Sequence, residues 1–185
     1  MARKFNIMYF GLPKERIRLV HFPRPKKDGL AGMIQGDAFN SNIGILVDDR
    51  ADYAGLFNTS DNIPFVHMLP ETFYGIKSGN NAARTALFHE LGHFINGDHI
   101  KFANESDYDE ERARQIRNGS IMECEKISDD FAVKYLGAEY VAIGLEEILN
   151  RKDYFLDSED PDEDQEWYEL AQKELRLRIE RIRNL

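Results

Sequence analysis

The chain has 185 residues, the length of one domain, and its 42% hydrophobic and 31% charged content is ordinary for a globular protein. The formal net charge of −9 argues against a general nucleic-acid binder, and the single cysteine, Cys124, excludes an internal disulfide framework. No run approaches the ~20 apolar residues that span a bilayer, and the start has no signal-peptide pattern, so we expect a cytoplasmic protein.

Strand-like patterns occupy the first part of the chain. Short apolar segments favour strands at residues 5–10, 42–47 and 62–69. Prolines and glycines between residues 11 and 31 disfavour long regular elements there. Pro64 places the third strand at a sheet edge or delays its start, because proline cannot donate a ladder hydrogen bond. We therefore expect a small, mostly antiparallel sheet.

Helical patterns begin at residue 78. Ser78 to Asn81 offers N-cap residues for a helix that runs through His93 and ends near Asn96 and Gly97. An acidic run at 157–166, interrupted by Pro161, is typical of a solvated loop. Further helices are predicted at residues 105–117 (or a mobile insertion there), 122–136, 138–150 and 167–185. These patterns predict one α+β domain over residues 1–185, with a β-rich part (1–77) and a helical part (78–185).

The most informative motif is His89-Glu90-Leu91-Gly92-His93, an H-E-x-x-H pattern on a predicted helix. Residues four apart lie about 6 Å apart along the axis and roughly 40° apart around it. Two such imidazoles can reach one Zn²⁺ at about 2.0–2.1 Å. Glu90 can then accept a proton from the zinc-bound water, and the small Gly92 lets another element approach closely. The alternative is two surface histidines that flank a glutamate on an amphipathic helix.

Two residues compete to be the third ligand, because a catalytic zinc site takes three protein ligands and leaves a position for water. Glu125 could bind zinc while Asp129, four residues later on a predicted helix, accepts a hydrogen bond from a ligand histidine. His99 requires the chain to double back after the helix, and Met122 would then form a methionine-containing turn beneath the site. We favour Glu125, because His99 leaves the Glu125–Asp129 helix without a role.

Other side chains have both a structural and a functional interpretation. His67 lies in the strand just upstream, and it could face the cleft if that strand is an edge strand that pairs with extended substrate. Tyr135 and Tyr140 could stabilise the oxyanion of a tetrahedral intermediate, or could serve packing. Cys124 could close the site as a fourth ligand, although adjacent helical residues point about 100° apart.

The H-E-L-G-H-F-I-N-G-D segment at 89–98, followed by Glu125-x-x-x-Asp129 and Phe131-Ala132, resembles gluzincin metallopeptidases. It is especially similar to the HtpX and CAAX prenyl protease group, where H-E-x-x-H precedes E-x-x-x-D. A second resemblance is to the ImmA/IrrE family of regulatory metallopeptidases, although Ser128 and Asp129 replace that family's Ala-Asn. The resemblance covers about residues 82–137 and does not extend to the membrane helices of the first group. A compact minigluzincin core therefore fits the length better.

The resemblance implies a zincin-like fold, with the sheet packed on the motif helix, and a peptide or protein substrate. It implies Zn²⁺ held by His89, His93 and Glu125, with Glu90 as the general base and Asp129 behind a ligand histidine. Two other functions stay open: an ImmA/IrrE-like regulatory protein with one specific partner, and a non-catalytic zinc-binding interaction module.

Overall fold

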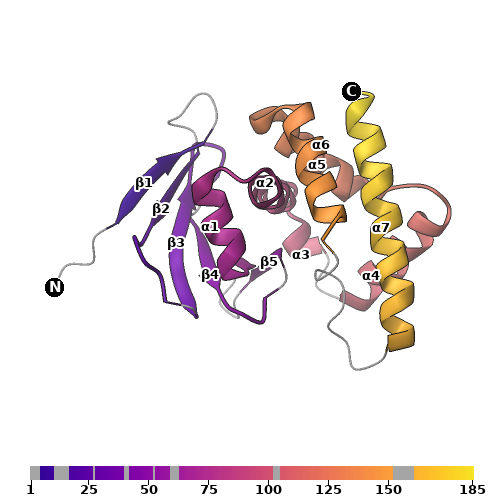
Figure 1. Ribbon diagram of the computed structural model, residues 1–185, viewed down its shortest axis with the longest axis horizontal. Coiled ribbons are helices and arrows are strands. Elements are labelled where there is room, and N and C mark those ends of the chain that lie inside the picture. Colours follow the sequence, from indigo (N-terminus) through magenta and orange to yellow (C-terminus); the bar gives the residue numbers. More distant parts are fainter. Residues whose placement is uncertain are drawn as a thin grey trace.

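The computed structural model describes residues 5–10, 17–26, 28–39, 42–51, 53–58, 63–101, 105–151 and 161–185, without the side chains of residues 58, 99, 101, 105–107 and 161–164. A six-stranded sheet forms one side of the molecule and helices form the other, as Figure 1 shows. The predicted α+β class is therefore confirmed. The division of the whole chain into one domain stays a prediction.

The sheet is mixed, with strand order β1-β2-β3-β4-β6-β5. Its strands are β1 (Asn6–Tyr9), β2 (Arg18–His21), β3 (Gly29–Gln35), β4 (Ile43–Val47), β5 (Ala54–Asn58) and β6 (Pro64–Met68). Every neighbouring pair is antiparallel except β4 and β6, as the expected mostly antiparallel sheet requires. Burial alternates along β4 and β6, so one face of these central strands packs on the core and the other faces away from it.

Strand β6 lies between β4 and β5 and is not an edge strand, which corrects the position expected for His67. Pro64 is the first residue of β6, so the delayed start is the right alternative. On the strand face away from the core, His67 contacts the rings of Phe57 and Phe65 at centroid distances of 6.1 and 6.4 Å. The edge strand beside the helices is instead β5.

The helices follow the predicted order with two differences. Their bounds are α1 (Pro70–Ser78), α2 (Asn81–Asn96), α3 (Asp98–Lys101), α4 (Glu105–Arg117), α5 (Glu123–Leu136), α6 (Ala138–Leu149) and α7 (Pro161–Arg183). Helices α1 and α3 were not predicted, and α1 begins before the expected boundary at residue 78. The acidic residues 161–166 belong to α7 and not to a loop, whereas residues 152–160 lie outside the described part of the chain.

Helix α2 lies between the sheet and the other helices (Figure 1) and has the predicted ends. The side chain of Asn80 accepts a hydrogen bond from the Ala83 amide at the start, and Gly97 ends the helix in the left-handed conformation at φ 74°. Its apolar side chains pack into the core on the sheet side, where Leu87, Phe88 and Leu91 are fully buried. A helix enclosed in this way holds any polar side chain it carries in a fixed position.

Gly92 allows α2 and α5 to pack closely, which confirms the role expected for this small residue. A Cβ atom at position 92 would lie 2.5 Å from Ser128 Cα and 2.8 Å from the Ser128 carbonyl oxygen. We expect Gly92→Ala to lower the free energy of unfolding by about 1–3 kcal/mol, because backbone on both sides must move. Thermal or denaturant unfolding measures this loss. Gly44→Ala is the control, because its Cβ would meet its nearest atom at 3.5 Å; equal losses in both variants would contradict the close packing.

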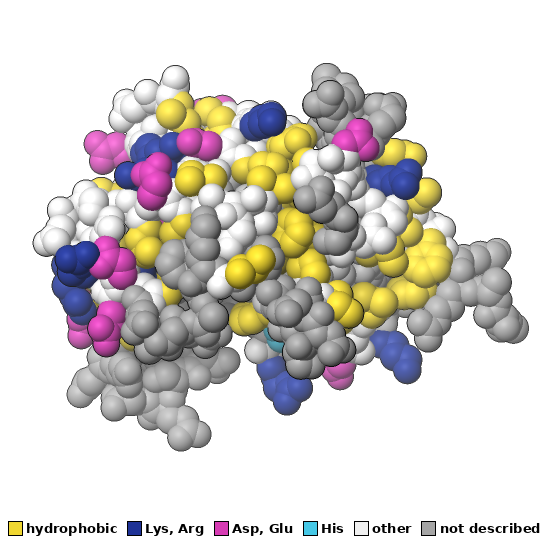
Figure 2. All heavy atoms as spheres, turned by 180° about the vertical axis from the view of Figure 1, so that it is seen from behind, with side chains coloured by type: hydrophobic (Ala, Val, Ile, Leu, Met, Phe, Trp, Pro, Cys, Tyr) yellow, Lys and Arg dark blue, Asp and Glu magenta, His cyan; other side chains and the backbone are white. Residues whose placement is uncertain are grey.

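Among the described residues, no helix combines the length and the apolar character needed to cross a bilayer. Figure 2 shows one face of the molecule, on which basic side chains lie in small groups and several have acidic neighbours. No broad basic field is drawn for the described residues on that face. The absence of nucleic-acid and membrane partners stays a prediction.

Candidate metal centre

Three side chains from two helices bring potential metal-binding atoms together. His89 and His93 come from α2, and Glu125 comes from the first turn of α5. One ligand atom from each lies within 4.8 Å of the others, so this group could hold a metal ion. His89 is only 7% exposed and Glu125 only 2%. The alternative of two surface histidines on an amphipathic helix therefore does not hold.

The distances within the group fit a tetrahedral ion. Two ligand atoms at about 2.0–2.1 Å from a tetrahedral metal are separated by about 3.3 Å. The two Nε2 atoms of His89 and His93 lie 3.0 Å apart. The Glu125 carboxylate places Oε2 at 3.2 Å from His89 Nε2 and Oε1 at 3.5 Å from His93 Nε2. These separations are therefore compatible with one ion held by the three side chains.

Each histidine is oriented by a carboxylate on its other nitrogen. Asp129 Oδ1 lies 2.9 Å from His89 Nδ1, which is the contact expected between Asp129 and a ligand histidine. Asp98 Oδ2 lies 2.9 Å from His93 Nδ1, and Asn96 Nδ2 donates to both Asp98 oxygens. A carboxylate on Nδ1 favours the tautomer in which that nitrogen carries the proton, which leaves Nε2 free to bind a metal.

Asp98 was missed in the sequence, although it is the last residue of the quoted H-E-L-G-H-F-I-N-G-D segment. The position of Asp98 near His93 could have been inferred, because Gly97 was already identified as the end of the helix. The left-handed residue at 97 turns the chain and places Asp98, at the start of α3, beside the ring of His93.

The electrostatics of the group favour a cation. Burial alone lowers the pKa of His93, but hydrogen bonds to Asp98 and Glu125 and nearby carboxylate charge raise it to about 10. Burial raises the pKa of Glu125, yet the positive charge of Arg112 and the hydrogen bonds to the two histidines hold it well below its usual range. A metal ion bound here has to displace the proton from His93 Nε2, because an imidazole ligand binds in its neutral form.

The other ligands considered from the sequence do not join this group. Cys124 is buried and free, but the potential metal group found among the described residues contains His89, His93 and Glu125 alone. Burial raises the pKa of the Cys124 thiol to about 11, which disfavours the thiolate that binds metals. The side chain of His99 lies outside the described residues, so its part in the site is untested.

A cavity of about 720 Å³ adjoins the three ligands. It is lined by the edge strand β5, by α2 and by parts of α4, α6 and α7. Glu90 lines it from α2, the helix that also carries both histidines. A cavity of this volume has room for several residues of a peptide, and Glu90 lines it together with the three potential metal ligands.

The two tyrosines considered for oxyanion stabilisation lie elsewhere. Tyr140 donates a hydrogen bond to the Gly79 carbonyl oxygen, and Tyr135 packs against Phe88 and Phe131, so both have structural contacts. Two tyrosines line the cavity, Tyr108 of α4 and Tyr168 of α7, and the Tyr108 hydroxyl donates to Glu125 Oε1 at 2.5 Å. Tyr108 was missed in the sequence, because its charged neighbours indicated an exposed helix.

The C-terminal helix α7 also contributes to the centre, which the sequence did not predict. Arg178 donates to both Asp129 oxygens, from Nη2 at 2.6 Å and from Nε at 3.0 Å. Its Nη2 also lies 2.8 Å from His89 Nδ1, because both nitrogens are directed at the same Asp129 oxygen. Burial raises the pKa of Asp129, but the positive charge of Arg178 and the hydrogen bond from His89 lower it overall. The carboxylate behind His89 is therefore held ionised.

No family model, no curated protein and no solved structure matches the chain. The comparisons thus neither support nor oppose a relationship to the gluzincin or ImmA/IrrE families.

Proposed function

We propose that this chain is a zinc-dependent metallopeptidase of the gluzincin type, with a zincin-like arrangement of sheet and motif helix. The observation that carries the proposal is the convergence of His89, His93 and Glu125 beside a cavity that Glu90 also lines. Two imidazoles, one carboxylate and a neighbouring glutamate are the groups that a zinc hydrolase requires.

In this proposal His89, His93 and Glu125 hold Zn²⁺. The ion would supply a Lewis acid that polarises a substrate carbonyl and lowers the pKa of a water molecule beside it to about 7. Glu90 accepts a proton from the attacking water and passes it to the amine that leaves. Asp129 and Asp98 keep the two imidazole rings in the orientation that directs Nε2 at the ion.

Strand β5 is suited to hold an extended substrate. It is the edge of the sheet, and its residues 54–57 line the cavity. One side of its backbone pairs with β6, so the other side is available to pair with a peptide. We propose that the substrate adds to this edge, which places a scissile carbonyl between the metal ligands and Glu90.

Tyr108 is a hydroxyl donor directed at the proposed ligand Glu125. Its hydroxyl lies 2.5 Å from Glu125 Oε1, an oxygen of the proposed ligand, so it is close to the metal position. Burial and the adjacent Glu125 raise the pKa of Tyr108, so the phenol stays protonated and able to donate a hydrogen bond.

The proposal is tested by metal-dependent proteolysis. We expect the purified protein to bind about one equivalent of zinc and to cleave peptides, with cleavage lost after chelation and restored by zinc but not by magnesium. New peptide termini are identified by mass spectrometry, both in a mixed peptide pool and in an extract of native host proteins. Cleavage of one host protein alone would favour the regulatory alternative. A zinc-loaded protein that cleaves nothing in either mixture would contradict a peptidase.

A further inference from the structure

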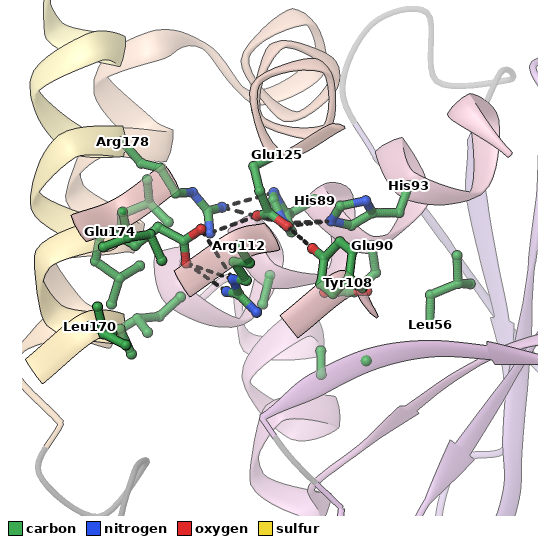
Figure 3. A pocket seen from close by; sticks show the side chains of 18 of the residues that line it. Leu56, His89, Glu90, His93, Tyr108, Arg112, Glu125, Leu170, Glu174 and Arg178 are labelled. Carbon is green, nitrogen blue, oxygen red and sulfur yellow. Dashed lines mark hydrogen bonds and ion pairs between the residues drawn. The ribbon is translucent and has the colours of Figure 1, made fainter. Parts of the chain in front are cut away.

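Both oxygens of the Glu125 carboxylate have a partner that is not a metal ligand. Tyr108 of α4 donates to Oε1 at 2.5 Å, and Arg178 Nη1 of α7 lies 3.4 Å from Oε2. Figure 3 shows Arg178 on one side of the carboxylate and His93 and Tyr108 on the other. The carboxylate is therefore fixed at both oxygens by helices other than its own.

The two helices that fix Glu125 are themselves joined through the same four-residue spacing. On α4, Tyr108 is followed four residues later by Arg112, and on α7, Glu174 is followed four residues later by Arg178. Residues four apart share a helix face. Arg112 donates to both oxygens of Glu174, with distances of 2.6 to 3.2 Å, so the second member of the α4 pair binds the first member of the α7 pair.

Together with the helix turns that carry the two four-residue pairs, these contacts form a ring that starts and ends at Glu125. It runs through Tyr108, Arg112, Glu174 and Arg178, and its side-chain contacts (Tyr108 with Glu125, Arg112 with Glu174, Arg178 with Glu125) are drawn in Figure 3. The side chain of Glu174 is 2% exposed and that of Arg178 is 7% exposed. A buried charge is costly unless it has a partner. Glu174 and Arg178 are therefore held in place by their partners, and this arrangement restrains the neighbouring ligand Glu125.

We propose that these four residues form a clamp that positions Glu125 as a metal ligand, so that the packing of α4 on α7 sets the affinity of the metal centre. The clamp, Tyr108, Arg112, Glu174 and Arg178, rests on the metal binding of the proposed function. Its members are positioning residues. The Tyr108 and Arg178 contacts hold the carboxylate in one orientation before an ion binds, so the ordering of Glu125 is already complete.

The clamp predicts that a substitution at a more distant member, Glu174, changes the zinc affinity by loosening Arg112. Glu174→Gln weakens the hold on Arg112, and Tyr108→Phe removes a single hydroxyl that touches Glu125. We expect each to raise the Kd for zinc about tenfold, within the range known for groups that support metal ligands. Because both act through one ring, the double variant is expected to bind zinc about as weakly as the weaker single variant. Competition with a chromophoric chelator measures all four affinities.

A matched control is available between the same two helices. Arg117 of α4 and Glu166 of α7 form an ion pair at 2.5 Å whose side chains are 56% and 65% exposed. Arg117→Gln removes that pair without touching the clamp, and we expect its Kd for zinc to stay within about twofold of the parent, as exposed pairs contribute little. Circular dichroism of the metal-free variants checks that all of them are folded.

The outcomes separate the clamp from the proposed function. If the parent binds zinc and Tyr108→Phe and Glu174→Gln bind it equally well, the clamp is wrong and the metal centre stands. The clamp is also overturned if the Kd of the double variant rises by the product of the two single effects. An equal loss of zinc affinity in Arg117→Gln overturns it as well. A parent that binds no zinc overturns the metal centre, and the clamp with it. For a variant with a low melting temperature, the absorption spectrum of bound Co²⁺ gives a second readout of ligand geometry.

Discussion

Glu90→Gln is expected to bind zinc as tightly as the parent and to lose about 10²–10⁴-fold in kcat/KM, the contribution typical of a general base. The substitution keeps the size of the side chain and removes its ability to take a proton. The three proposed ligands, His89, His93 and Glu125, are left in place. Zinc content by mass spectrometry and kcat/KM on a cleaved peptide give the two measurements.

The control for Glu90→Gln is Glu139→Gln, which changes an exposed glutamate of α6 that does not line the cavity. We expect this control to keep the parent's kcat/KM. Undiminished cleavage by Glu90→Gln would show that another group takes the proton. Loss of zinc from Glu90→Gln would instead give Glu90 a part in metal binding.

Glu125→Gln is expected to weaken zinc binding more than any clamp variant, by at least about 100-fold. The substitution removes the anionic ligand itself, whereas groups that only support a ligand contribute about 10- to 100-fold. Glutamine keeps the shape of the side chain and can still accept the hydrogen bond from Tyr108, so the fold should survive. Zinc affinity is measured by chelator competition on protein whose folding is checked by circular dichroism.

His99→Ala is the comparison that decides between the two candidates for the third ligand. We expect it to keep the parent's Kd for zinc, because Glu125 already lies 3.2 Å from His89 Nε2 and 3.5 Å from His93 Nε2. If His99→Ala lost zinc while Glu125→Gln retained it, the alternative ligand set with His99 would be correct.

The parts of the site that follow from local spacing were predictable from the sequence. His89 and His93 are one turn apart, and the same spacing joins Glu125 to Asp129, so each pair was assigned to one face of a helix. The helix limits followed from the N-cap residues between Ser78 and Asn81 and from Gly97 in the same way. In each case the relevant contacts lie within a few residues, where backbone geometry alone fixes which side chains meet.

The parts that depend on packing between distant segments were not predictable. Arg178 contacts Asp129 across 49 residues of sequence, and nothing in the charged pattern of α7 shows which face meets α5. Tyr108 and Glu174 both lie in highly charged helices, which are usually interpreted as solvent-exposed. Buried charge pairs and exposed ones look alike in one sequence, because burial is decided by the neighbouring elements.

The order of the last two strands was missed for a similar reason. The segment of β5, residues 54–58, was not recognised as a strand, so β6 was considered for the edge position beside the site. The chain passes from β4 to β5 and then returns to place β6 between them. Strand order of this kind depends on long-range pairing, which alternation of apolar residues within each strand does not specify.

The most direct test is a crystal structure of the zinc-loaded protein with anomalous diffraction collected on both sides of the zinc absorption edge. We expect one zinc ion per chain, bound by Nε2 of His89, Nε2 of His93 and a carboxylate oxygen of Glu125, with at least one further ligand that is not protein. An ion enclosed by four protein ligands, or one bound away from this trio, would contradict the peptidase proposed here.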